Sequence, residues 1–208
     1  GASMNLDEKR RIAAVLEEMG VDIIEAGFPI ASNGDFEAVR EIAKQTKTSS
    51  VAGLARAARR DIDRAWEALQ GAARPRIHTF ISTSPLHMKF KLQMEPEQVH
   101  QSIADSVAYA RKLCEDVEGS PEDGSRSEHD FLCRCVETAI KSGATPTNIP
   151  ATASYTTPPE DPELRARLGG AAQDAGQARV SRQRQHEPGT AGAPPPSGSK
   201  RARRSYES

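Results

Sequence analysis

The chain has 208 residues, of which 37% are hydrophobic and 27% charged, and its formal net charge at pH 7 is −1, so one domain with a sizeable core is expected. This near-neutral balance and the lack of any apolar run of about 18 residues give no support for nucleic acid or a membrane as a partner, and we expect neither. Its three cysteines, an odd number, argue against a disulfide framework and for a cytoplasmic location.

The first 150 residues alternate between helical and strand-like patterns. Helices are expected at 5–20, from 33 onward, and at 61–71, 96–113 and 129–142. Strands are expected at 21–27, 48–54, 76–82, 116–120 and 145–149. This alternation predicts a parallel sheet covered by helices. An open doubly wound sheet and a (β/α)8 barrel fit it equally well, although five strands fall short of the eight in a complete barrel.

The first of these helices has a clear start and a clear apolar face. Asn5 is a good N-cap, because its side chain can accept a hydrogen bond from the first turn of the helix. Ile12, Val15, Leu16 and Met19 recur at a spacing of three and four residues, which places them on one face. We therefore expect these four side chains to point into the core.

The composition changes near residue 160. Residues 161–208 hold 9 Lys and Arg against 5 Asp and Glu, contain the run Ala193–Pro196, and have few large apolar side chains. Such a segment buries too little apolar surface to offset its ordering entropy. We therefore expect a folded domain at 1–160 and a disordered Gly/Arg/Pro-rich tail at 161–208. The basic run Lys200–Arg204 is interpreted as a solvated tail rather than a nucleic-acid patch, since no aromatic residues interleave it.

Polar side chains stand at the ends of several predicted strands. Glu25 ends an otherwise apolar strand, where it could hold a cationic group or form a salt bridge with an arginine. Arg56 follows the next strand and could grip a carboxylate with two hydrogen bonds, or be plain surface charge. Thr152 offers a hydroxyl after the last predicted strand. In a parallel barrel these carboxyl ends are where functional residues gather.

The stretch Arg76–Leu92 is the most informative, because an apolar strand carrying His78 runs directly into a loop rich in hydroxyl, His and Lys groups. His78 has a period-two position from which its imidazole could point into a barrel, although a lone strand histidine is more often part of the core. Glu118, on the following strand, could pair with His78 for proton transfer.

Five motifs together resemble the 2-isopropylmalate synthases of the alpha-isopropylmalate/homocitrate synthase family: Gly1–Met4, Ile24–Pro29, Gly53–Arg56, His78–Ser84 and Asn148–Pro150. The resemblance implies a (β/α)8 TIM barrel, here with about five of its eight strands. It also implies an acyl-CoA-dependent acyltransferase that condenses acetyl-CoA with 2-oxoisovalerate in leucine biosynthesis. A divalent metal (Mn, Mg or Zn) and a homodimer are implied for the full-length family.

The same resemblance implies roles for individual residues. His78 and Thr152 would contact the oxo acid, with Glu25 and Arg56 in the same substrate pocket. Glu118 would lie beside the oxo acid near the metal's coordination sphere, and Glu118 and His78 would be the catalytic pair.

The family's metal-binding motifs, Arg-Asp-Gly-x-Gln and His-x-His, do not occur in this sequence. We therefore expect no metal ligands in this chain, no bound metal and no activity of the chain alone. The abrupt change near residue 160 resembles translation in a shifted reading frame. The alternatives are a sister acyltransferase (homocitrate or citramalate synthase), a non-catalytic interaction protein and a gene remnant.

Overall fold

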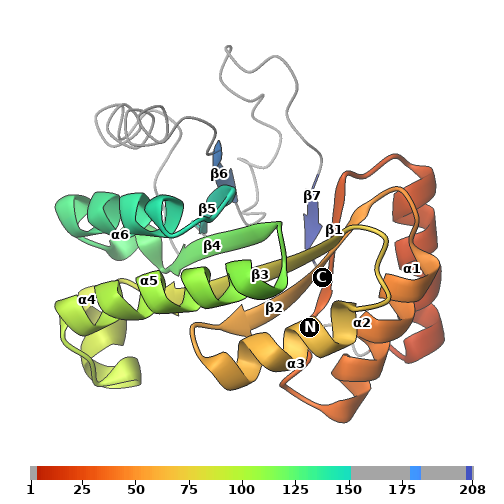
Figure 1. Cartoon of the computed structure of the whole chain (residues 1–208), viewed down its shortest axis with the longest axis horizontal. Helices are drawn as coiled ribbons and strands as arrows, with labels where there is room; N and C mark the ends of the chain where they lie inside the picture. The colour runs from red at the N-terminus through yellow and green to blue at the C-terminus, as the bar shows by residue number, and fades with distance from the viewer. Residues whose placement is uncertain (1–3, 151–178, 184–204, 208) are drawn as a thin grey trace, which may run out of the picture.

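The computed structural model describes residues 4–150, 179–183 and 205–207 (Figure 1). The strands in the first range are β1 (Ile23–Gly27), β2 (Ser50–Arg56), β3 (Pro75–Ser82), β4 (Val117–Glu122) and β5 (Pro146–Pro150). The long helices are α1 (Leu6–Glu18), α2 (Asn33–Gln45), α3 (Arg59–Leu69), α5 (Pro96–Leu113) and α6 (His129–Lys141). Each predicted element is present, with its ends displaced by a few residues.

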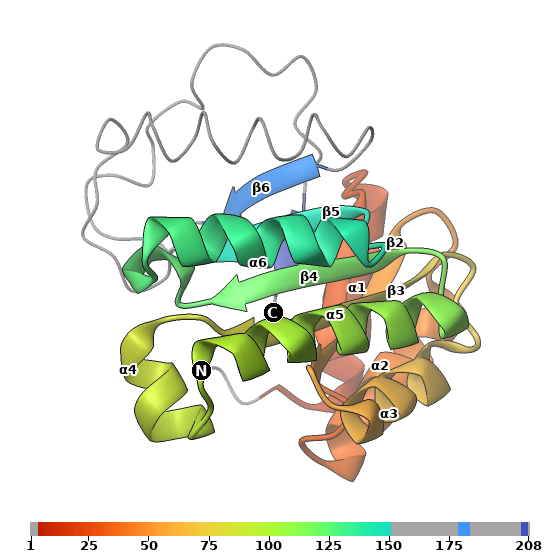
Figure 2. The ribbon, with the colours of Figure 1, turned by 60° about the vertical axis from the view of Figure 1, so that its left-hand side comes forward.

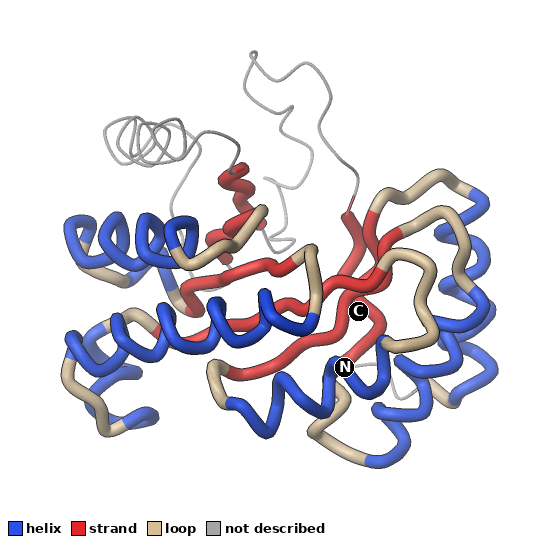
Figure 3. The backbone as a smooth tube through the Cα atoms, viewed as in Figure 1, coloured by secondary structure: helices blue, strands red, loops and turns tan. Residues whose placement is uncertain are grey.

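Strands β1 to β5 are parallel and lie side by side in chain order. In a doubly wound sheet the strand order reverses at a switch point, which sends helices to both faces. Sequential order with right-handed crossovers sends every helix to the same face, as in a (β/α)8 barrel. Figures 1 and 3 show α2, α3 and α5 packed along one face of the sheet. Of the two folds that the sequence pattern allows, the doubly wound sheet and the (β/α)8 barrel, this arrangement fits part of a barrel.

The core lies between the sheet and these helices. Strand residues alternate between the two faces, so Val51, Gly53 and Ala55 of β2 point at the helices. Gly53 lets α3 approach closely, because a Cβ atom there would stand 3.2 Å from Leu69 Cδ1. Leu69 is fully buried at 0% exposure. The opposite face of the sheet carries the polar residues described below.

Two short strands lie within the segment that we expected to be disordered. β6 (Arg179–Gln183) pairs with β5 (Figure 2), and β7 (Ser205–Glu207) pairs with β1 (Figure 1), both in parallel. The edges of an open sheet offer unpaired backbone groups to an extended segment, and the expected disorder of the tail stays a prediction. Within the described residues no pairing joins β6 to β7, so the sheet stays open. The division of the chain at residue 160 stays a prediction.

Helix α1 begins as expected but does not bury its apolar face. The Asn5 side chain accepts a hydrogen bond from the Glu8 amide at 2.9 Å, and the Glu8 carboxylate accepts one from the Asn5 amide in return. Ile12, Val15 and Met19 are nevertheless exposed, at 37, 53 and 64%. Periodicity identifies an apolar stripe, but it does not reveal whether a neighbour covers that stripe. Among the described elements, α1 packs chiefly on α2 and β1.

No helix in the described part of the chain is long and apolar enough to cross a membrane.

The packing of Leu69 gives a direct test of the core. We expect Leu69→Ala to lower the free energy of unfolding by about 2–5 kcal/mol, because it removes buried methyl groups and leaves a cavity beneath β2. Leu86→Ala is the matched control, since Leu86 is 53% exposed, and it should change stability by about 0.5 kcal/mol or less. Urea unfolding of the two variants measures both values, and equal losses would contradict this packing.

Candidate functional site

A polar cluster occupies the face of the sheet that the helices do not cover. A Cβ atom on Gly119 would meet Ala139 of α6, so the flanking residues Glu118 and Ser120 point to the other face. His78 is in register with Glu118 and points to that same face. Strand alternation and register therefore bring together side chains that lie about 40 residues apart in the sequence.

His78 is held through both ring nitrogens. Its Nδ1 contacts the Glu25 carboxylate, its Nε2 lies 2.6 Å from Ser120 Oγ, and Glu118 Oε1 stands 3.8 Å from the same Nε2. The imidazole is only 6% exposed. The structure thus unites three of the predicted site residues, Glu25, His78 and Glu118. Their roles in binding and catalysis stay predictions.

Arg76 balances part of the negative charge of the cluster. Its Nε and Nη2 donate to Asp116 Oδ2 at 2.9 and 2.8 Å, and its Nη1 donates to Glu118 Oε2 at 3.0 Å. The guanidinium is 3% exposed, so these two carboxylates compensate for the hydration that it loses. Sequence reasoning missed both Arg76 and Ser120. The available signal was their spacing, since each stands two residues from a predicted site residue on the same strand.

Arg56 lies apart from this cluster. As the last residue of β2, it donates from Nε to Asp61 Oδ2 at 2.6 Å and from Nη2 to Asp61 Oδ1 at 3.2 Å. These hydrogen bonds raise the pKa of the Arg56 guanidinium. Its side chain is 60% exposed. A substrate carboxylate that binds to Arg56 would compete with Asp61 for the guanidinium. The substrate-binding role of Arg56 therefore stays a prediction. Thr152 lies outside the described residues.

The segment after β3 is helical rather than the polar loop that we expected. A single turn, α4 (Pro85–His87), continues into a π-helical segment, η1 (Met88–Leu92), which ends at Gln93 in the left-handed conformation. Pro85 favours this start, because its fixed φ suits the first turn of a helix.

Two carboxylates at the end of β4 anchor this segment. Lys91 Nζ lies 2.8 Å from Glu122 Oε2, and Glu122 also accepts a hydrogen bond from Ser82. His87 Nδ1 lies 3.6 Å from Asp123 Oδ2. Burial alone would raise the pKa of both carboxyls. The hydrogen bonds that Glu122 accepts from Lys91 and Ser82 outweigh this effect, and so does the hydrogen bond that Asp123 accepts from Arg126. Both pKa values are therefore lowered.

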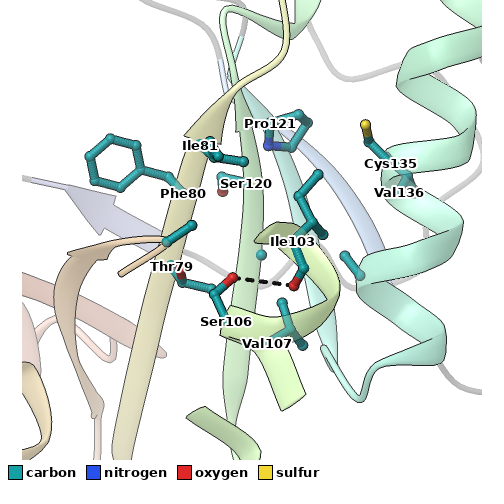
Figure 4. A pocket seen from close by; sticks show the side chains of 13 residues that line it. Thr79, Phe80, Ile81, Ile103, Ser106, Val107, Ser120, Pro121, Cys135 and Val136 are labelled. Atoms are coloured by element: carbon teal, nitrogen blue, oxygen red, sulfur yellow. Dashed lines mark hydrogen bonds between the residues drawn. The ribbon is translucent and has the colours of Figure 1, made fainter. Parts of the chain in front are cut away.

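A small cavity lies on the opposite, helix-facing side of the sheet (Figure 4). Its lining includes Thr79, Ile103, Val107 and Cys135, and it has room for about one water molecule. Burial raises the pKa of the Cys135 thiol to about 12, so this cysteine stays protonated and unreactive. The cavity lies between β3, β4, α5 and α6, and Ser120 of the polar cluster is also among its lining residues.

The described residues do not fit a complete divalent-metal site. No group of three His, Cys, Asp or Glu side chains among them could hold a metal ion. Glu25, His78 and Glu118 lie together, but they bond to one another, to Ser120 and to Arg76 instead of converging on one point.

Comparison with known proteins gives a consistent family assignment. The sequence profile of the HMGL-like family matches residues 1–179. A 2-isopropylmalate synthase of Caulobacter vibrioides (strain NA1000 / CB15N) is 64% identical over 164 residues, which are 79% of this chain and 31% of that protein. One from Rhodopseudomonas palustris (strain BisB5) is 55% identical over 181 residues, 87% of this chain and 34% of the relative. The chain thus spans about a third of the length of the curated relatives that it matches.

Solved structures show the same fold at low sequence identity. Hydroxymethylglutaryl-CoA lyase from Pseudomonas aeruginosa superposes with a TM-score of 0.67 at 15% identity, covering 87% of this chain and 61% of the lyase chain. The Bacillus subtilis HMG-CoA lyase gives a TM-score of 0.59 at 14% identity, covering 88% and 71%. These likenesses support the fold, and the described part of this chain is a partial TIM barrel.

The charge balance at Arg76 generates a stability prediction. Arg76→Met should lower the free energy of unfolding by about 3–5 kcal/mol, because it leaves the buried Glu118 carboxylate uncompensated. Adding Glu118→Gln should recover part of that loss. Arg40→Met is the control, since its pair with Glu37 is exposed and is worth at most about 1 kcal/mol. A double-mutant cycle measured in urea checks these values, and additive effects of the first two substitutions would contradict the coupling.

The lowered pKa values of Glu122 and Asp123 generate a pH prediction. A carboxyl whose pKa is depressed on folding stabilises the fold above its unfolded pKa, and that contribution disappears as the pH falls through the folded value. Stability should therefore decline as the pH drops below the ordinary values of 4.5 and 3.8. The variants Glu122→Gln and Asp123→Asn should each flatten this decline in urea unfolding between pH 5 and 2. Glu37→Gln, which removes an exposed carboxylate, is the control. An unchanged slope in both test variants would contradict the assignment.

Proposed function

The chain belongs to the HMGL-like family, and on that premise we propose that it is part of a 2-isopropylmalate synthase. In the complete protein its polar face would help to condense acetyl-CoA with 2-oxoisovalerate, as a cytoplasmic, acyl-CoA-dependent acyltransferase of leucine biosynthesis. The identity of 53–64% to proteins of that name supports this choice of family branch.

The observation that carries the proposal is the position of His78 between two buried carboxylates. A condensation of this kind removes a proton from an acetyl methyl group and delivers a proton to the oxygen of the oxo acid. A histidine that contacts Glu25 and stands 3.8 Å from Glu118 lies beside two carboxylates with which it can exchange a proton. His78 and Glu118 are therefore the proposed acid–base pair.

The oxo acid would lie against the same face. In this proposal His78 and Thr152 contact it, Glu25 orients the imidazole, and Arg56 lies at the rim of the pocket. Homocitrate and citramalate synthases are the alternative, because they would place a different oxo acid on the same barrel. His78 together with the segment Ser82–His87 favours the isopropylmalate branch.

We propose further that this chain alone does not catalyse the condensation. It spans about a third of its relatives' length, and the sheet formed by its described residues is open. The divalent metal of the family and its homodimeric assembly belong, in this proposal, to the complete protein.

Equilibrium dialysis with labelled 2-oxoisovalerate tests the binding role. We expect saturable binding that His78→Asn abolishes and His100→Asn leaves intact, since His100 bonds to Thr138 between α5 and α6. Pyruvate and 2-oxoglutarate should compete weakly. Equal binding to the wild type and to His78→Asn would contradict the site, and stronger binding of pyruvate or 2-oxoglutarate would favour the sister enzymes.

Release of CoA thiol from acetyl-CoA in the presence of the oxo acid tests the activity. We expect no release above the uncatalysed rate with this chain alone. Sustained release would show that the segment is sufficient for catalysis.

A further inference from the structure

We propose that Glu25, His78 and Ser120 form a carboxylate–imidazole–hydroxyl relay that activates the Ser120 hydroxyl as a nucleophile toward acyl esters. This hydrolytic activity is separate from the condensation and requires neither acetyl-CoA nor an oxo acid.

The three groups come from three neighbouring regions of the sheet. Glu25 lies on β1, His78 on β3 and Ser120 on β4. The separation of 2.6 Å between His78 Nε2 and Ser120 Oγ is within the range for a nucleophile and its general base. Glu25 contacts the other ring nitrogen, Nδ1, and supplies the third group that orients the base. A nucleophile, a base and an orienting carboxylate in this arrangement are recognised as a catalytic triad by their geometry, on any fold.

The hydrogen-bond pattern assigns a direction to the relay. An ionised carboxylate can only accept hydrogen bonds, so Nδ1 must carry the proton that it shares with Glu25. In a neutral imidazole the other nitrogen then has a free lone pair. When the ring is neutral and Nδ1 carries the proton, the Ser120 hydroxyl donates to Nε2, which is the direction that proton removal from a nucleophile requires.

The charges around His78 favour the imidazolium that forms when the serine attacks. Glu25 contacts one side of the ring, and Glu118 Oε1 stands 3.8 Å from Nε2 on the other. Arg76 binds the second oxygen of Glu118 and holds that carboxylate in place. Glu25, Glu118 and Arg76 thus set the charge around the ring.

Ser120 is buried, at 6% exposure, and it is the member of the relay that lies nearest the carboxyl ends of the strands. It stands two residues beyond Glu118, toward the carboxyl ends of the strands, and it is in register with Phe80. Phe80 is half-buried, and Leu54, in register with His78, is half-buried too. An ester that lies against these two side chains would approach the hydroxyl from the open face of the sheet.

The chemistry balances without an added oxidant or reductant. Ser120 Oγ attacks the acyl carbon while its proton moves to His78 Nε2. The bond from that carbon to the leaving oxygen then breaks, and the leaving group takes the proton from Nε2. Water repeats the sequence on the acyl-serine, which releases a carboxylic acid and restores the hydroxyl.

The test uses p-nitrophenyl acetate with the intact chain. We expect nitrophenolate release, together with an acetyl group that peptide mass spectrometry locates on Ser120. His78→Gln should slow acetylation by about 100-fold or more, because it removes the general base, and Ser120→Ala should abolish it. The rate should fall at acidic pH, where a protonated His78 cannot accept the hydroxyl proton.

Ser106→Ala is the matched control. The Ser106 hydroxyl is equally buried at 6% but donates to the Ile103 carbonyl, away from any histidine, so this variant should react like the wild type. Acetylation confined to lysines, or an unchanged rate in a folded Ser120→Ala variant, would overturn the proposal. Because the site is mapped in the wild-type chain, a variant that fails to fold does not remove the test. The outcome is also independent of whether the chain binds 2-oxoisovalerate.

Discussion

Burial of the Arg76 guanidinium between Asp116 and Glu118 is the interaction on which the polar face depends. A parallel sheet with helices on one side must fill its other face, and here it does so with ionisable groups. The ion pair holds Glu118 at a fixed distance from His78, and Glu25 fixes the opposite side of the ring. The order of this face therefore comes from charge pairing, whereas the helix-facing side is ordered by close packing around Gly53 and Leu69.

The open sheet explains features that look unrelated. An exposed apolar stripe on α1, short added strands at both edges and a match to about a third of each relative's length all belong to part of a barrel. In a closed barrel each helix has a neighbour on either side and each strand has two partners. Among the described elements α1 packs chiefly on α2 and β1, and Ile12, Val15 and Met19 are exposed.

Much of the fold was predictable, because the periodicity of apolar residues and the residues that cap helices are local properties of the sequence. The Asn5 cap, the strand carrying His78 and the helix from Pro96 all lie where the pattern places them. The exposure of Val15 was not predictable, since it depends on what packs outside the helix. Their positions on the predicted strands identified Glu25, His78 and Glu118 as candidates, and the family resemblance implied their roles. Arg76 and Ser120 were missed because their partners lie on neighbouring strands. The role of an arginine or serine inside a strand can be inferred only when the strand register shows which carboxylate or imidazole it contacts.

The most direct test of the account is the tautomer of His78, read from the 15N chemical shifts of its imidazole at neutral and alkaline pH. A ring fixed between Glu25 and Ser120 should show a protonated Nδ1 and an unprotonated Nε2. Glu25→Gln should weaken that preference. The opposite tautomer, or the averaged shifts of a freely exchanging imidazole, would contradict the arrangement on which both the proposed acid–base pair and the serine relay depend.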